Sequence, residues 1–244
     1  MTEQTLKTGQ FYITAPSPCP YLAEKFERKV FTPVPPVAAN AAVINAALTL
    51  QGFRRSQNII YRPLCEGCQA CVSVRVPVAE FKPDKTMRRL YKTNADIVVE
   101  IIAPQASQEQ YTLFKAYLAA RHATGSMADM TFSDYAMMVG DSAVNCNLIE
   151  YRRAPDSTNR SGKLVGVALT DNLPDGCSMV YSFYDPAEKK RSLGTYIILE
   201  HIHRTAQNAL PYVYLGYWVE GSDKMHYKIR FQPQEHLGKG GWRR

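Results

Sequence analysis

The sequence predicts an α+β fold, because strand-like and helix-like segments follow one another in both halves without repeats or low-complexity tracts. In the C-terminal half, three strand-like segments come before a long helical pattern, a further strand and a final helix. Hydrophobic residues make up 45% and charged residues 21% of the 244 residues, which is typical of a globular protein with its own core. We therefore expect a layered α+β architecture.

The N-terminal half is predicted to hold short strands around one helix. Residues 11–13 form a strand, and the prolines of PSPCPYL then fix an extended turn. An apolar helix over residues 40–50 ends at Gly52. Strands follow at residues 58–62 and 72–78, and Pro77 indicates that the end of the second strand is at a sheet edge.

The middle of the chain carries recognisable helix starts. Asp84 caps a helix that includes residues 87–91, and a strand follows at 95–103. Ser107 and Gln110 match a capping box, which predicts a helix over 108–122. A short helix follows at 134–139. We place a boundary between Ala103 and Ser107, which gives an N-terminal cysteine-containing domain (1–104) and a C-terminal domain (105–244).

The elements expected after this boundary are strands at 145–153, 164–170, 179–184 and 212–218, a polar turn at 154–162, and helices at 192–209 and 223–231.

Charge and hydropathy limit the partners of the chain. The net charge of +7 permits a polyanionic partner but does not require one. Residues 1–10 have no apolar core, so we expect no signal peptide. The apolar stretch over 34–50 is interrupted by prolines and asparagines, so we expect no membrane span and a cytoplasmic protein.

A cluster of cysteines stands in front of the strand at 72–78. Cys65, Cys68 and Cys71 follow the spacing C-x2-C-x2-C, and Cys19 is a remote fourth thiol. Such thiols suit zinc or an iron–sulfur cluster equally well, and the alternative is a set of thiols without metal. The strand that follows, VSVRVPV, carries Arg75 as its only charge.

No P-loop, GxSxG elbow or HExxH motif is present. His201 and His203 are two residues apart on a predicted helix, so they cannot share a metal, and we expect both at the surface. Lys189, Lys190 and Arg191 stand beside a predicted helix start, where backbone amides bind anions. The alternative is a solvated lysine cluster.

Four blocks occur in a recognisable order: YRPLCEGCQACVSVRVPV, RHATGSM, SFYDPAEKKRSLGTY and YLGYWVEGSDKMHYKIRFQP. Together they resemble the arginyl-tRNA–protein transferase family over nearly the whole chain. The compact length resembles the bacterial branch of that family, the aspartate/glutamate leucyltransferases.

The resemblance implies that the C-terminal domain is a GNAT-like acyltransferase. It implies transfer of leucine from leucyl-tRNA to the N-terminus of proteins beginning with Asp or Glu, which marks them for degradation. The ester is already activated, so positioning supplies much of the rate and the transfer requires no cofactor. The oligomeric state is not indicated.

Site residues follow from that chemistry. A cation must bind the acidic side chain of the acceptor, and the candidates are Arg75 first, then Lys224 and Arg230. The residues expected to line the reacting end are Tyr217, Ser222 and Tyr227. The residues expected to hold tRNA phosphates are Lys189, Lys190 and Arg191, and those expected to hold a metal are Cys19, Cys65, Cys68 and Cys71.

The sequence also departs from the wider family. Eukaryotic members pair a second cysteine with the one near Cys19, where this chain has Leu22, and they carry adjacent cysteines in place of the spaced ones. A four-thiol site is therefore assembled differently here, or is absent.

Three alternatives stay open. The same reaction can use arginyl-tRNA as donor. A coenzyme-A acetyltransferase would show R/Q-x-x-G-x-G/A, and Arg191 and Gly194 fit this motif, but Tyr196 occupies the small position. A non-enzymatic metal-thiolate module that binds RNA leaves the block at 214–231 unexplained.

Overall fold

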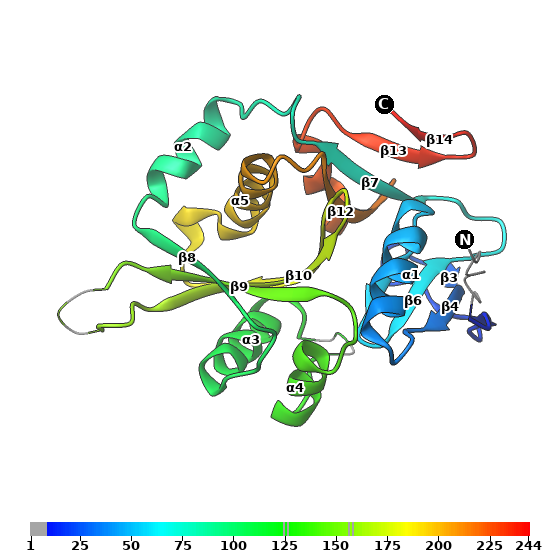
Figure 1. The fold of residues 1–244 in the computed structure, drawn as a ribbon, viewed down its shortest axis with the longest axis horizontal. Helices are drawn as coiled ribbons and strands as arrows, with labels where there is room; N and C mark the ends of the chain where they lie inside the picture. The colour runs from blue at the N-terminus through cyan, green and yellow to red at the C-terminus, as the bar shows by residue number, and fades with distance from the viewer. Residues whose placement is uncertain (1–8, 124, 126, 156, 158) are drawn as a thin grey trace, which may run out of the picture.

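The computed structural model describes residues 9–123, 125, 127–155, 157 and 159–244. Two residues of the RHATGSM block and two of the expected polar turn lie outside these ranges. An eight-stranded sheet forms the centre of the molecule (Figure 1). In spatial order its strands are β14 (Gly241–Arg243), β13 (Glu235–Gly238), β7 (Cys71–Pro77), β12 (Tyr212–Val219), β11 (Gly176–Tyr184), β10 (Leu164–Leu173), β9 (Cys146–Arg153) and β8 (Ile97–Ile102).

Helices cover both faces of this sheet, as Figure 1 shows. On one face lie α2 (Lys85–Thr93) and α5 (Leu193–Gln207), and on the other α3 (Gln108–Arg121) and α4 (Phe132–Gly140). Leu199 of α5 and Phe114 of α3 are fully buried in the two separate cores that result. The expected α+β class is confirmed.

The helix starts are fixed by the side chains that the sequence indicated. The Asp84 carboxylate accepts a 2.7 Å hydrogen bond from Met87 N, and Ser107 and Gln110 form a complete capping box. Thr131 opens α4 with a further box, which the prediction missed. This helix therefore begins at Phe132, before the expected residue 134.

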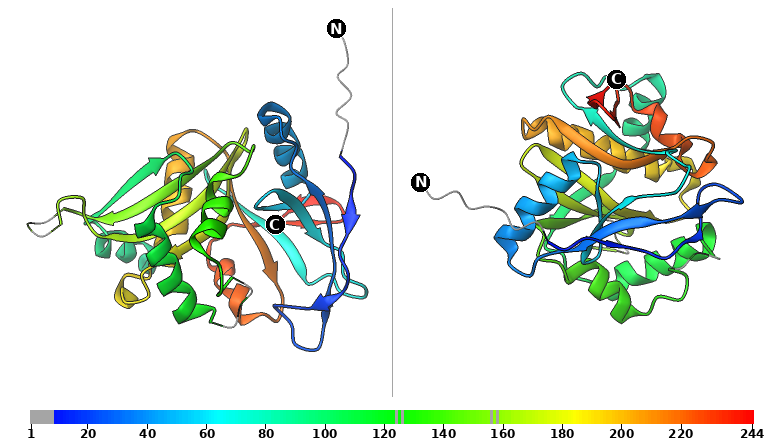
Figure 2. Two further views of the ribbon diagram at one scale, coloured as in Figure 1. Left: turned by 90° about the horizontal axis from the view of Figure 1, so that it is seen from below. Right: turned by 90° about the vertical axis from the view of Figure 1, so that its right-hand side faces the viewer.

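A smaller, four-stranded sheet packs beside the large one (Figure 2). Its strand order is β1 (Tyr12–Ile13), β4 (Lys29–Pro33), β6 (Ile59–Pro63) and β5 (Arg54–Ser56), and α1 (Ala38–Leu50) packs against it. A separate two-stranded ladder joins β2 (Ser17–Pro18) to β3 (Phe26–Glu27).

The short elements account for most of the differences from the sequence prediction. The sequence did not indicate β3, β4, β5, β13 and β14. The expected last helix divides into α6 (Asp223–His226) and a 3-10 turn (Tyr227–Arg230). Strand β7 lies inside the sheet, but it pairs with β13 only at Val74 and Arg75, so its end at Pro77 pairs with β12 alone.

The predicted division at residues 104/105 stays a prediction. The eight-stranded sheet takes β7 and β8 from its N-terminal side. Within the described residues, no helix combines the length and the apolarity that crossing a membrane requires.

A buried ion pair joins the two sheets. Arg55 of β5 donates to both carboxylate oxygens of Asp171 on β10, at 2.5 to 2.9 Å, and each side chain is 1% exposed. Asn45 of α1 donates to the same carboxylate at 3.1 Å. Because both partners are removed from water, the pair is satisfied only while the sheets stay packed.

We expect Asp171→Asn to lower the free energy of unfolding by about 3–5 kcal/mol, because it leaves the Arg55 charge buried and unpaired. Urea unfolding followed by circular dichroism measures the loss. Glu66→Gln is the matched control: it removes the exposed pair with Arg28, so its effect should stay below about 1 kcal/mol. Equal effects of the two changes would contradict the role given to Asp171.

Candidate active site

Strands β11 and β12 separate partway along their length. They pair in parallel only at Gly176–Tyr212, Cys177–Val213 and Ser178–Tyr214, although β11 continues to Tyr184 and β12 to Val219. The described residues show no ladder between the two strands beyond these pairs. We call the region between the unpaired parts of the two strands, residues 179–184 of β11 and 215–219 of β12, the divergence. Backbone groups that face the divergence need other partners or a ligand.

Two basic side chains each bind one carbonyl at the divergence. Arg54 donates to Ser178 Oγ at 3.1 Å and to the carbonyl of Met179, the first β11 residue beyond the paired stretch. Lys228 Nζ donates to the carbonyl of Tyr217 on β12 at 2.6 Å. On each side of the divergence, one backbone carbonyl therefore accepts a hydrogen bond from a cation, Arg54 for β11 and Lys228 for β12.

Gly216 allows Arg54 to approach. It lies at a β-bulge in β12 and has φ of +80°, which favours glycine. A Cβ at this position would lie 3.1 Å from Cζ of Arg54, closer than side chains normally pack. The guanidinium thus lies against the backbone next to Tyr217, whose carbonyl binds Lys228.

Both cations are buried. Arg54 is 7% exposed and Lys228 is 5% exposed, and neither has a carboxylate within ion-pair distance among the described residues. Burial, followed by the positive charge of Arg54, lowers the pKa of Lys228 to about 7. Near neutral pH, Lys228 therefore exists in both protonation states.

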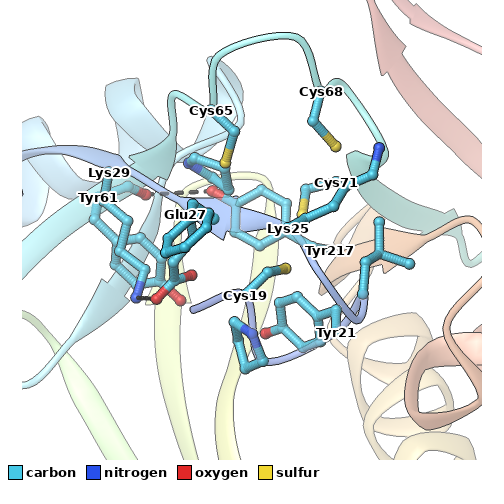
Figure 3. A pocket seen from close by; sticks show the side chains of 14 residues that line it. Cys19, Tyr21, Lys25, Glu27, Lys29, Tyr61, Cys65, Cys68, Cys71 and Tyr217 are labelled. Atoms are coloured by element: carbon cyan, nitrogen blue, oxygen red, sulfur yellow. Dashed lines mark hydrogen bonds and ion pairs between the residues drawn. The ribbon is translucent and has the colours of Figure 1, made fainter. Parts of the chain in front are cut away.

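The four candidate metal ligands surround one pocket of about 50 Å³ (Figure 3). Its walls include Cys19, Cys65, Cys68 and Cys71, and Tyr217 closes one side. Burial, with the three neighbouring thiols, raises the pKa of Cys71 to about 12. Four gathered thiols match the donors that zinc and iron–sulfur clusters use. In the described ranges, no three potential ligands converge as a metal site.

Tyr217 links this cysteine pocket to the divergence. Its hydroxyl donates to the carbonyl of Gly52 at 2.8 Å, two residues before Arg54, and its carbonyl binds Lys228. Burial raises the pKa of the hydroxyl far above its usual range. The hydroxyl therefore stays protonated near neutral pH and is a poor acid, and the geometry favours a positioning role for Tyr217.

The other two residues expected at the reacting end lie on the segment after β12. Ser222 is buried, and its hydroxyl has no hydrogen-bond partner among the described residues, so it can bind a ligand. Tyr227 is 44% exposed, and its ring centroid is 5.8 Å from Lys228 Nζ. The structure places Tyr227 beside Lys228 and Ser222 three residues after the end of β12, and their roles at the reacting end stay predictions.

Arg75 is already fully engaged. Its Nη2 lies 2.7 Å from the Glu235 carboxylate and Nη1 donates to Tyr214 at 3.1 Å. The guanidinium also packs over the rings of Tyr212 and Trp242, with centroids 3.6 and 4.4 Å away. Because its charge is neutralised and covered, the geometry favours a structural role over the expected contact with substrate.

The remaining predicted cations do not gather in one place. Lys224 donates to the carbonyl of Pro20 at 3.3 Å, beside the cysteine pocket, while Arg230 is exposed. Lys189 and Lys190 are exposed, as a phosphate-binding pair requires. Arg191 instead binds the Asp96 carboxylate at 2.6 and 2.8 Å and Glu188 at 3.1 Å.

The sequence reasoning missed Arg54 and Lys228. Neighbouring side chains on a strand point to opposite faces of the sheet, so Arg54 and Arg55 cannot share one exposed face. This pattern could have indicated a buried role for one of them. For Lys228 we find no comparable signal. The surface position expected for His201 is wrong, because this residue is 2% exposed and its ring hydrogen-bonds Thr170 and the Ile197 carbonyl.

Comparison with known proteins identifies the family. The model described as "Arginine-tRNA-protein transferase, N terminus" matches residues 17–89, and the model of the C terminus matches residues 109–238. The chain belongs to this family. A relative from Nitrobacter hamburgensis is 57% identical over 100% of this chain and 95% of its own. Another, from Brucella ovis, is 56% identical and is covered over 99%. Both are named aspartate/glutamate leucyltransferase.

Solved structures resemble this member of the family more distantly. FemX superposes with a TM-score of 0.48 at 8% identity, covering 91% of this chain and 84% of its own. A tandem GNAT protein from the clavulanic acid pathway superposes with a TM-score of 0.42 at 12% identity, covering 91% and 59%.

The pKa of Lys228 predicts a pH dependence of stability. Between about pH 7 and the ordinary lysine pKa of about 10.4, the unfolded chain binds a proton that the folded chain does not. Stability therefore rises with pH in this window, by up to about 1.4 kcal/mol per pH unit from this group. Below about pH 7 both states are protonated and the slope vanishes.

Urea unfolding of the wild type and Lys228→Met between pH 6.5 and about 9 isolates this contribution, since other groups titrate equally in both proteins. We expect the wild type to gain stability relative to the variant as the pH rises. A difference that stays constant over this range would show that Lys228 keeps its ordinary pKa.

Proposed function

We propose that the chain transfers leucine from leucyl-tRNA to the α-amine of proteins that begin with Asp or Glu. The observation that carries the proposal is the full-length match to relatives named aspartate/glutamate leucyltransferase, at 56–57% identity. In this proposal the chain is a cytoplasmic aminoacyltransferase, and its product is a protein marked for degradation by a new N-terminal leucine.

The divergence of β11 and β12 supports an acyl transfer at this place. The acceptor amine attacks the ester carbonyl, a carbon–nitrogen bond forms, and the ester bond to the tRNA ribose breaks. The amine loses its proton and the ribose hydroxyl gains one. Beyond the paired stretch, backbone amides of β11 and β12 that face the divergence have no partner strand on that side among the described residues, and they are the proposed donors for the oxyanion of the intermediate.

The reaction does not require a strong base. An α-amine has a pKa of about 7.7–8.0, so a useful fraction is neutral at physiological pH. Positioning of this amine against the activated ester then supplies much of the rate. Ser222 and Tyr227 contact the reacting end in this scheme, and Tyr217 positions β12, the strand that leads into the segment carrying them.

The exposed Lys189 and Lys190 are the proposed contacts for tRNA phosphates. Arg191 is removed from this group, since Asp96 and Glu188 already neutralise it. Arg230 and Lys224 are exposed on the segment that follows β12, and a contact with the acceptor stays a proposal for both.

Cys19, Cys65, Cys68 and Cys71 line one pocket without converging on a single point, and they are proposed to close around zinc or an iron–sulfur cluster. The group would crosslink the N-terminal segment to the start of β7 and so fix the wall formed by Tyr217. No step of the transfer passes through it.

Two structural observations disfavour a coenzyme-A acetyltransferase. Arg191, which would face the pyrophosphate, is bound to carboxylates. The start of α5 is also covered, because a Cβ at Gly194 would lie 2.9 Å from the Tyr184 ring. Tyr196 is buried in the core and does not itself obstruct this helix end, contrary to the reason that the sequence suggested.

We expect the purified protein to transfer labelled leucine from leucyl-tRNA to peptides beginning with Asp or Glu, but not to one beginning with Ala. Scintillation counting of the isolated peptides measures the transfer. Parallel reactions with arginyl-tRNA identify the donor. Absence of transfer, or equal transfer to the Ala peptide, would refute the assignment.

We also expect protein purified without oxygen to contain iron or zinc, measured by elemental analysis. Cys68→Ser should lose most of this metal, because three thiols bind far more weakly than four. Cys146→Ser is the control, since Cys146 is buried in the core formed by α3 and α4. A metal-free preparation with full activity would remove the metal from the proposal.

A further inference from the structure

We propose that Arg54 and Lys228 together bind the side-chain carboxylate of the acceptor's N-terminal residue and so select Asp and Glu. This inference deepens the proposed function and rests on it. The pair formed by these two residues is called the acid clamp below.

The position of the acid clamp is the first argument. Arg54 reaches the divergence from the small sheet and binds Met179 on β11, while Lys228 reaches it from the 3-10 turn and binds Tyr217 on β12. The guanidinium packs against Gly216, which directly precedes Tyr217. The two cations therefore converge where the paired part of β11 and β12 ends.

The missing counter-ion is the second argument. Of the three buried arginines in the described residues, Arg55 is paired with Asp171 and Arg75 with Glu235, both within 2.8 Å. Arg54 has a hydroxyl and a carbonyl as partners instead. A buried cation without an acid is costly, and an anionic ligand would remove that cost.

Free donors are the third argument. A guanidinium has more N–H groups than the two that Arg54 uses, and its Nε has no partner among the described residues. Lys228 uses a single donor, toward Tyr217. The acid clamp can therefore donate to both oxygens of a carboxylate without losing the bonds that hold the strands.

The surroundings favour a small anion at the end of a chain. Both cations are less than one-tenth exposed, which favours a slender terminal carboxylate over a tRNA phosphate that carries a ribose on either side. The other groups whose charges act on the acid clamp are three tyrosines and two thiols: Tyr61, Tyr217, Tyr227, Cys71 and Cys177. In this proposal, the side chain of a residue with nothing before it in the chain enters between the two diverging strands.

Lys228 also explains how the empty site is tolerated. Its pKa of about 7 allows the side chain to release a proton when no anion is present, which lowers the repulsion with Arg54. A bound carboxylate favours the charged form and brings the proton back. Near neutral pH, a bound acid therefore increases the fraction of molecules in which both cations are charged.

The test compares peptides that differ only in their first residue: Asp, Asn, Glu and Gln. We measure kcat/KM for leucine transfer with the wild type, Arg54→Gln and Lys228→Met. The ratio of Asp to Asn cancels the chemistry of the amine and of the donor, and so reports the carboxylate alone. Arg54→Gln should lower this ratio by roughly 10- to 100-fold, and Lys228→Met by roughly 3- to 10-fold.

Arg75→Gln is the matched control. It removes an equally buried arginine whose charge Glu235 already neutralises, so the ratio of Asp to Asn should not change even if stability falls. A drop in this ratio with Arg75→Gln alone would return the role to Arg75 and overturn the proposal.

Two further results would overturn the acid clamp. One is an unchanged ratio in both Arg54→Gln and Lys228→Met. The other is an equal loss for all four peptides with a raised KM for leucyl-tRNA, which would place the two residues at the donor or at the oxyanion. If Arg54→Gln does not fold, the same ratio measured with Arg54→Lys and Lys228→Met decides.

Failure of the proposed function gives a different result. If the wild type transfers leucine to no peptide, the reaction assignment is wrong, and equilibrium binding of the Asp and Asn peptides then tests the acid clamp by itself. Preferential binding of the Asp peptide that Lys228→Met abolishes would support it. Equal binding of the two peptides would refute it.

Discussion

The candidate site depends on how the small N-terminal sheet is attached to the large one. Two neighbouring arginines on β5 make that attachment. One of them is neutralised by a carboxylate and, within the described residues, the other is not. Arg55 forms a closed, buried ion pair with Asp171 that fixes β5 on β10. Arg54 points the other way and binds polar groups of β11 that are uncharged. The ion pair therefore holds in place a second cation that retains its charge.

The cysteine pocket lies within reach of the same arrangement. The side chain of Tyr217 lines the pocket. Its hydroxyl donates to the carbonyl of Gly52, and its own carbonyl accepts a hydrogen bond from Lys228. A change in the thiols, through metal or oxidation, can thus reach the divergence through a single residue. Figure 3 shows the thiols and Tyr217 on adjoining walls of the pocket.

Sequence patterns predicted the regular elements well, because capping residues and hydrophobic periodicity are local. The capping box at Ser107 and the strand that contains Arg75 are confirmed. The partners of charged residues were not predictable, since they lie far away in the chain: Glu235 is 160 residues from Arg75. A lone charge in an apolar strand pointed to a ligand, whereas its counter-ion came from β13, a strand too short to show a pattern.

The place of β7 has a consequence for how the protein is made. This strand is synthesised early, yet its neighbours in the sheet are β12 and β13, which come from the last part of the chain. During translation, β7 therefore lacks both of its neighbouring strands until nearly the whole chain has left the ribosome. Such long-range pairing makes folding slow and leaves an apolar strand exposed to wrong partners. Until the final residues of the chain arrive, β7 thus remains a site at which aggregation can begin.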